Sequence, residues 1–363
     1  MRTSLCGPSL LLLALCACGG GGASASGVGV PYDAGDAVDG GALHGVDGGP
    51  DGAAGASLDG GASDGATATG DGGALLPRTY GGRQYLLYVP AAYAAASPAP
   101  LVVMLHGCTQ DPADFAAGTA MDTQAEAAGF LVAYPDEPTS ANADKCWNWF
   151  LPGDQARGAG EPALLAGLVG NVAGDYSVDP RRVFAAGLSA GAAMAVIVGA
   201  TYPDVFAAIA VHSGLEYQAA SDATSAIAAA GSGGPDPKAQ GDLAYSAMGT
   251  VARPVPVIVF HGDADGVVNV INGQQVASAW VETDSRAGAQ VAAPTTSSGS
   301  AGGKTFSRTT YGDATTSKSL VDLYVVHGLA HAWSGGSSAG TFTDPSAPDA
   351  TALIWQFFAS HGR

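Results

Sequence analysis

Basic residues are scarce in this chain, and charged residues of either sign are few. The 363 residues include 14 Lys and Arg against 32 Asp and Glu, which gives a formal net charge of −18, and charged residues make up 13% of the sequence. Nucleic-acid partners require a basic stripe, and anionic membrane faces attract basic segments. The composition therefore argues against a nucleic-acid partner and against electrostatic docking on a membrane.

Long apolar runs are missing as well, and so are two common metal-binding motifs. The apolar run near the N-terminus, Leu10–Cys18, has nine residues, whereas a membrane-spanning helix needs roughly 20. No later run is long enough to span a membrane. The chain contains neither His-Glu-x-x-His nor Cys-x-x-Cys, so the sequence suggests no metal site.

The first 18 residues have the pattern of a signal peptide. Arg2 forms a short positive region, and Leu10–Cys18 forms the apolar region that follows it. The residues just before Cys18 are similar to a bacterial lipobox, which predicts a lipid on Cys18 and an anchor in the outer membrane. Ordinary cleavage after Ala25 or Ser26 is the alternative. Both interpretations place the mature protein outside the cytoplasm, either secreted or held at the cell envelope.

Cysteine is also rare, and its positions leave few possible pairings. Three of the five cysteines lie within the first 18 residues, so Cys108 and Cys146 are the two that remain. In an oxidising compartment outside the cytoplasm, two cysteines allow a single connectivity. We therefore expect a Cys108–Cys146 disulfide, and two buried thiols are the alternative.

Glycine is abundant, and its distribution separates two parts of the chain. Residues 19–75 hold 20 Gly, 12 Ala and 8 Asp, with no Lys or Arg. Such a segment cannot bury enough apolar surface to offset the entropy lost on ordering. We therefore predict a disordered tether over residues 19–76 and a single folded catalytic domain over residues 77–363.

In the folded part, short apolar runs alternate with longer helical patterns. Several runs, such as 101–105, are apolar on both faces, as strands covered by helices on both sides are. This alternation predicts an α/β fold with a mostly parallel central sheet and helices on both of its faces. The Ser-, Thr- and Gly-rich residues 291–304 predict an exposed loop. We expect strands at 84–89, 101–105, 130–134, 183–186, 207–211, 255–260 and 320–326, and helices at 113–128, 161–174, 190–201, 217–230, 273–286 and 348–360.

The pattern Gly-x-Ser-x-Gly occurs three times, but one copy stands in the right context. Gly187–Gly191 follows an apolar run and precedes an Ala-rich helical stretch, whereas Gly61–Gly65 and Gly336–Gly340 have no such neighbours. A nucleophile elbow requires a strand, a sharp turn and a helix in that order. We therefore predict Ser189 as the nucleophile, with the backbone N–H of Ala190 as an oxyanion donor.

A nucleophilic serine needs a basic histidine and an acid that orients it. Asp263 and Asp265 both follow the strand predicted at 255–260, and we favour Asp265. His327 and His331 both follow the strand at 320–326. We favour His331, because it lies further into the loop and can swing over the serine. His212, at the end of another strand, is interpreted as a structural residue.

The second oxyanion donor is expected from the loop after an early strand. That loop follows the strand at 101–105 and contains Cys108. We predict that the backbone N–H of Cys108 fills this role. A disulfide to Cys146 would then fix this loop to the aromatic segment that Cys146 begins. Trp147 and Trp149 in that segment, with Trp333, are candidate substrate contacts, and burial in the core is the alternative.

Taken together, six motifs resemble the polyhydroxybutyrate (PHB) depolymerase-type esterases, a family that also includes feruloyl and acetylxylan esterases. The resemblance implies an α/β-hydrolase fold, serine esterase activity without a cofactor, secretion, and Ser189, Asp265 and His331 as the catalytic triad. It implies an ester substrate, and it does not imply any protein partner. The motifs are Leu105–Gln110, Cys146–Phe150, Gly158–Pro162, Asp179–Val183, Gly187–Gly191 and Gly328–Trp333.

The predicted substrates are short-chain hydroxyalkanoate oligomers or polymer, with plant polysaccharide esters of feruloyl or acetylxylan type as the alternative. True polymer depolymerases of this kind carry an added polymer-binding domain, and the extra sequence here is a tether, so attack on solid polymer is left open. A peptidase on the same fold is a further alternative. Outside the enzymes, a surface-anchored binding module is possible, but such a module has no need of a complete Ser-Asp-His set.

Overall fold

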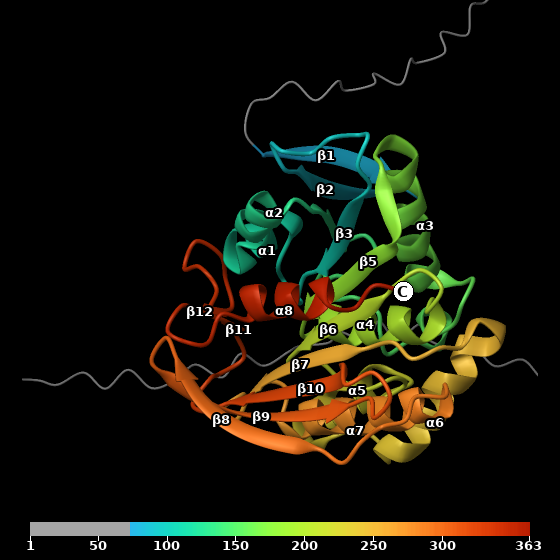
Figure 1. Cartoon of the computed structure of the whole chain (residues 1–363), viewed down its shortest axis with the longest axis vertical. Coiled ribbons are helices and arrows are strands. Elements are labelled where there is room, and N and C mark those ends of the chain that lie inside the picture. The colour runs from blue at the N-terminus through green and yellow to red at the C-terminus, as the bar shows by residue number, and fades with distance from the viewer. Residues whose placement is uncertain (1–72) are drawn as a thin grey trace, which may run out of the picture. The chain divides into compact units, whose positions relative to one another are not determined.

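A computed structural model of the chain describes residues 73–363 (Figure 1). The predicted signal peptide, the lipidation at Cys18 and nearly all of the predicted tether lie outside the described residues. Within them, the first strand begins at Ala74, before the predicted domain start at residue 77, because residues 74–80 pair in register with residues 83–89. The ordered fold therefore begins slightly earlier than the change in composition indicates.

A ten-stranded sheet forms the centre of the fold, with the strand order β1-β2-β4-β3-β5-β6-β7-β10-β9-β8. The six central strands, β4, β3, β5, β6, β7 and β10, pair with one another in parallel. The outer strands β1 and β2 at one edge, and β9 and β8 at the other, pair with their neighbours in antiparallel fashion. The predicted mostly parallel sheet is thus confirmed. The strands are β1 (Ala74–Tyr80), β2 (Arg83–Val89), β3 (Ala99–Leu105), β4 (Leu131–Pro135), β5 (Val178–Leu188), β6 (Ala208–His212), β7 (Val257–Gly262), β8 (Thr295–Ala301), β9 (Lys304–Gly312) and β10 (Ser319–Val326), with a separate pair β11 (Trp333–Ser334) and β12 (Thr343–Asp344).

Helices cover both faces of the sheet, as the α/β-hydrolase prediction requires. Along β3, Leu101 and Val103 pack into one core with α3, α4 and α7, whereas Val102 and Met104 pack into a second core with α1, α2 and α8. Figure 1 shows α8 crossing in front of the sheet. No helix among residues 73–363 is long and apolar enough to cross a membrane. The helices are α1 (Pro112–Thr119), α2 (Met121–Ala128), α3 (Gly160–Asp175), α4 (Ala190–Thr201), α5 (Ala223–Ser232), α6 (Pro237–Met248), α7 (Ile271–Arg286) and α8 (Ala350–Ala359).

Helix caps explain where the structure departs from the predicted helices. The helix expected at 113–128 is divided into α1 and α2 at Ala120, which has a left-handed backbone with φ of 51°. The helix expected from residue 217 begins at Ala223, because Asp222 caps its N-terminus in a capping box. Helix α6 was not predicted, although Asp236 followed by Pro237 is a good helix start.

The prediction that residues 291–304 form a loop is wrong, although the segment is exposed as expected. Residues 295–301 form β8, an edge strand that pairs along its length with β9. Gly302 and Gly303, with φ of 69° and 147°, make the tight turn between the two strands. The segment is exposed, so its polar composition resembles that of a loop. Its threonines nevertheless suit a strand, and β9 supplies the pairing that a sequence alone does not show.

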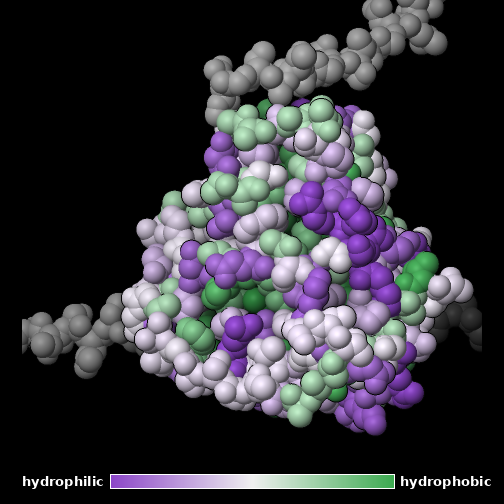
Figure 2. Space-filling model, in the orientation of Figure 1, coloured by the Kyte–Doolittle hydropathy of each residue, from purple (hydrophilic) through white to green (hydrophobic). Residues whose placement is uncertain are grey.

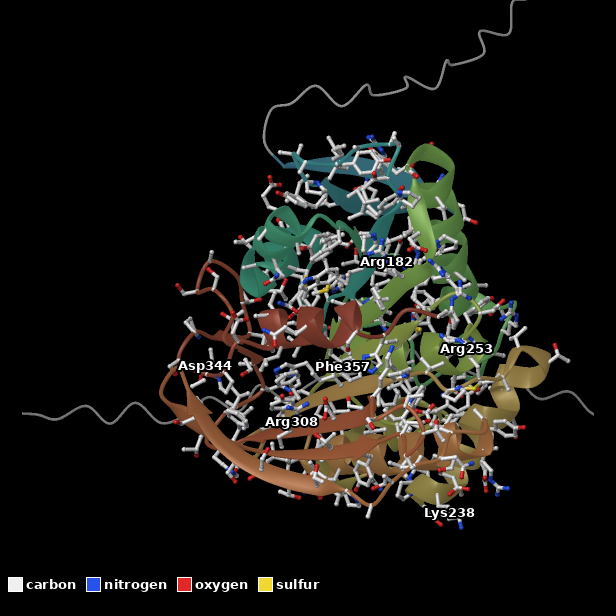
Figure 3. All side chains as sticks on the ribbon, in the orientation of Figure 1. Arg182, Lys238, Arg253, Arg308, Asp344 and Phe357 are labelled. Atoms are coloured by element: carbon white, nitrogen blue, oxygen red, sulfur yellow. A yellow bond between two sulfur atoms is a disulfide. The ribbon has the colours of Figure 1, made fainter. Side chains whose placement is uncertain are left out.

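Figure 2 shows hydrophilic residues gathered near the C-terminal end of the chain, where Arg363 bonds to the backbone of Arg181. Figure 3 places Arg182 and Arg253 on that side and Asp344 on the opposite side.

Candidate active site

Ser189 stands alone between the last residue of β5 and the first residue of α4. Its φ of 57° and ψ of −120° lie in a backbone region that residues other than glycine rarely adopt. Its own N–H donates to the carbonyl of His212 at 2.9 Å, which ties the turn to the neighbouring strand β6. Strain of this kind costs about 1–3 kcal/mol and marks functional turns.

The two glycines around Ser189 are required by sterics. A Cβ added at Gly187 would lie 2.4 Å from the carbonyl of Gly191, and one added at Gly191 would lie 2.1 Å from the carbonyl oxygen of Leu105. Neither position can accept a side chain, because the close neighbours are backbone atoms. The two glycines therefore reflect close packing of α4 against the end of β5 at Gly187 and against the end of β3 at Gly191.

Asp265 and His331 form a buried hydrogen-bonded pair at the same edge of the sheet. Asp265 follows β7, His331 follows β10, and the Oδ2 to Nδ1 distance is 2.8 Å. The other carboxylate oxygen, Oδ1, accepts from the amides of Val267 and Val268, both at 2.9 Å. Burial alone would raise the pKa of Asp265, but the hydrogen bond and charge of His331 and the two amides lower it below its usual value. The carboxylate is thus held ionised toward His331.

A second Asp–His pair joins the same two loops on the outside. Asp263 Oδ2 lies 2.8 Å from His327 Nδ1, and His327 Nε2 lies 3.1 Å from Ser307 Oγ. These side chains are exposed, with 38% for Asp263 and 43% for His327, whereas Asp265 is fully buried and His331 is 10% exposed. Ser307 is in the middle of strand β9, where no helix N-terminus follows it. Asp263 and His327, the alternatives to Asp265 and His331 in the sequence analysis, are therefore hydrogen-bonded to each other.

The loop after β3 lies against Ser189 and carries the disulfide. A Cβ built on Gly107 would be 3.5 Å from the Cβ of Ser189. The predicted disulfide between Cys108 and Cys146 is present in the structure. Among residues 73–363, the backbone N–H groups of Cys108 and Ala190 have no hydrogen-bond acceptor. The loop after β3 and the turn at Ser189 thus each carry a backbone N–H without an acceptor.

His212 supports the site without taking part in it. It is fully buried, its ring stacks on Trp333 with centroids 5.2 Å apart, and its Nε2 accepts from the N–H of Ser334 at 3.0 Å. Burial lowers the pKa of His212 to about 3, so the ring stays neutral. Because its carbonyl also holds Ser189, His212 links the serine turn to the chain just after His331.

The three tryptophans predicted to contact substrate lie in the interior. Trp147 is 0% exposed, Trp333 is 1% exposed and Trp149 is 7% exposed. The indole N–H of Trp333 donates to Thr351 Oγ1 at 3.0 Å. Side chains enclosed to this degree pack as core residues do. This burial favours the core alternative that the sequence left open, and a substrate contact by any of the three stays a prediction.

An apolar ring that the sequence did not single out lies closer to the chemistry. Phe342 is 38% exposed, and its ring centroid is 6.3 Å from that of His331. Val267, two residues after Asp265, is 46% exposed. The only sequence signal for Phe342 is an isolated aromatic residue in a segment of Gly, Thr and Ser.

A cavity of about 590 Å³ lies beside the site rather than in it. It is lined by β1, β2, the start of α1 and part of α3, and also by Asp111 and Lys145. Lys145 directly precedes Cys146, so the cavity adjoins the disulfide. Neither Ser189 nor the buried Asp265–His331 pair is among its lining residues.

In the described residues, the Ser189 hydroxyl also has no hydrogen bond to His331, which is common in sites without a bound substrate.

Comparison with known proteins gives concordant results. A family model described as Esterase PHB depolymerase matches residues 83–299. The chain is 41% identical to poly(3-hydroxyalkanoate) depolymerase C of Paucimonas lemoignei over 194 residues, which are 53% of this chain and 46% of that protein. It is 35% identical to feruloyl esterase B of Neurospora crassa over 140 residues, 38% of this chain and 46% of that protein. The chain thus spans about half the length of these curated relatives.

Among solved structures, an acetyl xylan esterase from Aspergillus awamori matches with a TM-score of 0.63 and 21% identity, covering 79% of this chain and 99% of that one. At this identity, the likeness shows the shared fold. Ser189 and Asp265 lie within the residues matched by the family model, and His331 lies beyond them. Since that match covers more than half of the chain, the chain belongs to the esterase PHB depolymerase family.

Proposed function

We propose that this protein is a serine esterase that hydrolyses carboxylic esters through an acyl-enzyme on Ser189. The observation that carries the proposal is the buried hydrogen bond between Asp265 and His331, on loops that leave the sheet at the same edge as the strained Ser189 turn. Because β5, β6, β7 and β10 are adjacent and parallel, their carboxyl ends converge there. A nucleophile, a base and an orienting acid are the three groups that acyl transfer needs.

The reaction follows from these positions. Ser189 Oγ attacks the ester carbonyl carbon while His331 Nε2 takes the hydroxyl proton, and Asp265 stabilises the imidazolium through Nδ1. The negative charge that develops on the carbonyl oxygen is bound by the N–H groups of Cys108 and Ala190. His331 then gives its proton to the leaving alcohol. A water molecule, deprotonated by His331, attacks the acyl-serine, which releases the acid and regenerates Ser189.

Hydroxyalkanoate esters are the substrate class that we favour. The relative with 41% identity is named as a poly(3-hydroxyalkanoate) depolymerase, and two exposed side chains close to the pair, Phe342 beside His331 and Val267 two residues after Asp265, are apolar. These side chains suit an acyl chain without charge. Feruloyl and acetylated polysaccharide esters are the second candidate, because the chain also resembles a feruloyl esterase at 35% identity.

We further propose that the protein works outside the cytoplasm, anchored through a lipid on Cys18. The signal-like segment at residues 1–18 supports export. The Cys108–Cys146 disulfide supports an oxidising compartment.

Substitutions in matched pairs test the triad. Ser189→Ala is expected to lower kcat by at least about 10³-fold, because the acyl-enzyme route is lost, while Ser338→Ala, in another Gly-x-Ser-x-Gly match, leaves kcat within about twofold. Asp265→Asn is expected to cost about 10²–10⁴-fold, whereas Asp263→Asn, in the exposed pair, costs less than about threefold. Hydrolysis of a p-nitrophenyl ester measures all four variants. A Ser189→Ala protein with near-normal turnover would rule out Ser189 as the nucleophile, whereas wild-type protein that hydrolyses no ester would favour the binding-module alternative.

A substrate panel tests the proposed specificity. Purified protein should hydrolyse 3-hydroxybutyrate oligomers with kcat/KM at least about tenfold above that for feruloyl sugars and acetylated xylan, since each lost apolar contact typically costs about 10–200-fold. Phe342→Ala should reduce this preference. A higher kcat/KM for feruloyl sugars would instead assign the protein to the second candidate class.

The disulfide is expected to serve catalysis as well as stability. Cys146→Ser frees the loop that carries the Cys108 N–H, and complete loss of an oxyanion donor costs about 10²–10³ in rate. Partial displacement should cost less, so we expect kcat to fall about tenfold at temperatures where the fold persists. Steady-state kinetics and thermal melting are measured on the same preparation, with wild-type protein reduced by dithiothreitol as the comparison. An unchanged kcat together with a lower Tm would restrict the bond to stability.

Lipidation is tested on the exported protein. We expect wild-type protein to fractionate with membranes and Cys18→Ser to be released, because two acyl chains anchor a protein stably whereas none remains in the variant. Mass spectrometry of the mature N-terminus should find a lipid-modified Cys18. An unmodified N-terminus near Ser26 or Gly27 would establish ordinary cleavage.

A further inference from the structure

Two buried carboxyl groups lie beneath the segment that begins at Cys146, and the proposed reaction uses neither. Glu137 follows β4 and is 0% exposed. Glu161, in the first turn of α3, is 4% exposed and belongs to the Gly158–Pro162 motif, to which the chemistry assigns no role. Carboxyl groups are almost never buried this deeply unless they are paired.

Glu161 holds one residue of that segment through both of its oxygens. Its Oε2 accepts from the backbone N–H of Asn148 at 2.8 Å, and its Oε1 accepts from the Asn148 side-chain amide at 2.7 Å. The same amide also reaches Glu137 Oε1 at 3.3 Å. Asn148 lies two residues after Cys146, which is bonded to Cys108. A continuous set of bonds thus runs from α3 to the loop beside Ser189.

The charges in this cluster do not balance if both carboxyl groups are ionised. Arg83 is the cation that contacts them: it pairs with Glu137, and its Nη2 is 4.0 Å from Glu161 Oε1. A second carboxylate would be buried without a counter-charge, which costs several kcal/mol. The cluster is therefore most stable when one of the two groups keeps its proton.

The groups facing the pair reinforce this conclusion. Asp154 accepts the backbone N–H of Glu161 at 2.8 Å and adds a negative charge. His106, whose Nε2 accepts the N–H of Glu137 at 3.0 Å, brings no positive charge, because burial lowers its pKa. Asp136 lies 3.9 Å from that same His106 nitrogen. Burial and the charge of Glu137 raise the pKa of Glu161 to about 8.

We propose that Glu161 is a positioning residue, which in its protonated form holds Asn148 and, through the Cys146–Cys108 disulfide, keeps the Cys108 N–H beside Ser189; this inference rests on the proposed function. Protonated Glu161 can donate to Glu137 while accepting from Asn148. When the proton is lost, two carboxylates face each other in the interior. Their repulsion displaces Asn148. Through the Cys146–Cys108 disulfide, this displacement also moves the loop after β3, which carries the Cys108 N–H.

The pH dependence has a definite sign. The pKa of Glu161 in the folded protein lies above that of a glutamate in the unfolded chain. At pH values between these two pKa values, the folded protein therefore binds one more proton than the unfolded chain does. The associated stability is complete at acidic pH and is lost as the pH rises through about 8. Activity should fall over the upper end of the same range.

The experiment compares kcat and KM between pH 6 and pH 10 for wild type, Glu161→Gln and Glu161→Ala. We expect the wild-type kcat to fall about tenfold through pH 8, with KM changing less, because a displaced oxyanion donor acts in the transition state. Glu161→Gln, which mimics the protonated acid, should lose this alkaline fall and stay within about threefold of wild type at pH 7. Glu161→Ala should lower kcat at pH 7 by about tenfold. Glu282→Gln, on α7 and paired with Arg286 at 2.9 Å, is the matched control and should keep the wild-type profile.

An equal alkaline fall in wild type and Glu161→Gln would overturn the proposal. A wild-type kcat that stays constant to pH 9.5 would also overturn it, even if neither variant folds. Ser189→Ala separates this inference from the proposed function. If Ser189→Ala is inactive and Glu161→Gln keeps the alkaline fall in kcat, only the role of Glu161 is disproved. If Ser189→Ala is active, the proposed esterase mechanism itself is disproved.

Discussion

The site depends on the close approach of helix α4 to strand β3. A Cβ at Gly191 would lie 2.1 Å from the carbonyl oxygen of Leu105, so the two backbones are in direct contact. This contact lies next to the strained turn at Ser189 and fixes the N-terminus of the helix, where free N–H groups favour negative charge. It also brings the loop after β3, with Gly107 and Cys108, against the serine. The nucleophile and both candidate oxyanion donors therefore follow from one packing constraint.

Burial distinguishes the two Asp–His pairs, which have the same hydrogen-bond length of 2.8 Å. A charge pair in solvent contributes little, because water competes and salt screens it. In the enclosed pair, two amides fix the carboxylate of Asp265 in addition to His331, so the imidazole is held in one orientation. The exposed pair instead joins the two loops at their bases, where Asp263 also accepts the N–H of Gly328 at 2.7 Å.

Local patterns predicted the parts of the fold that local physics determines. The strand–turn–helix around Ser189 is set by backbone sterics, which a sequence displays, and the order of acid and histidine after it is the one that the family resemblance implies. Strand β8 escaped prediction because its Ser and Thr residues resemble a loop until β9 pairs with them. Trp147 and Trp333 next to site motifs indicated substrate contacts, yet long-range packing places them in the interior. The Glu161 network is likewise invisible in sequence, since its partners come from three separate segments.

Covalent labelling tests the central claim, that the edge of the sheet activates a single serine. A fluorophosphonate reacts with a serine whose proton a neighbouring base removes and whose oxyanion is stabilised. Peptide mapping by mass spectrometry after brief exposure of the native full-length protein should find one adduct, on Ser189, and none after denaturation. Labelling of Ser307, the serine of the exposed Asp–His pair, or no labelling of native protein that hydrolyses esters, would contradict the assignment.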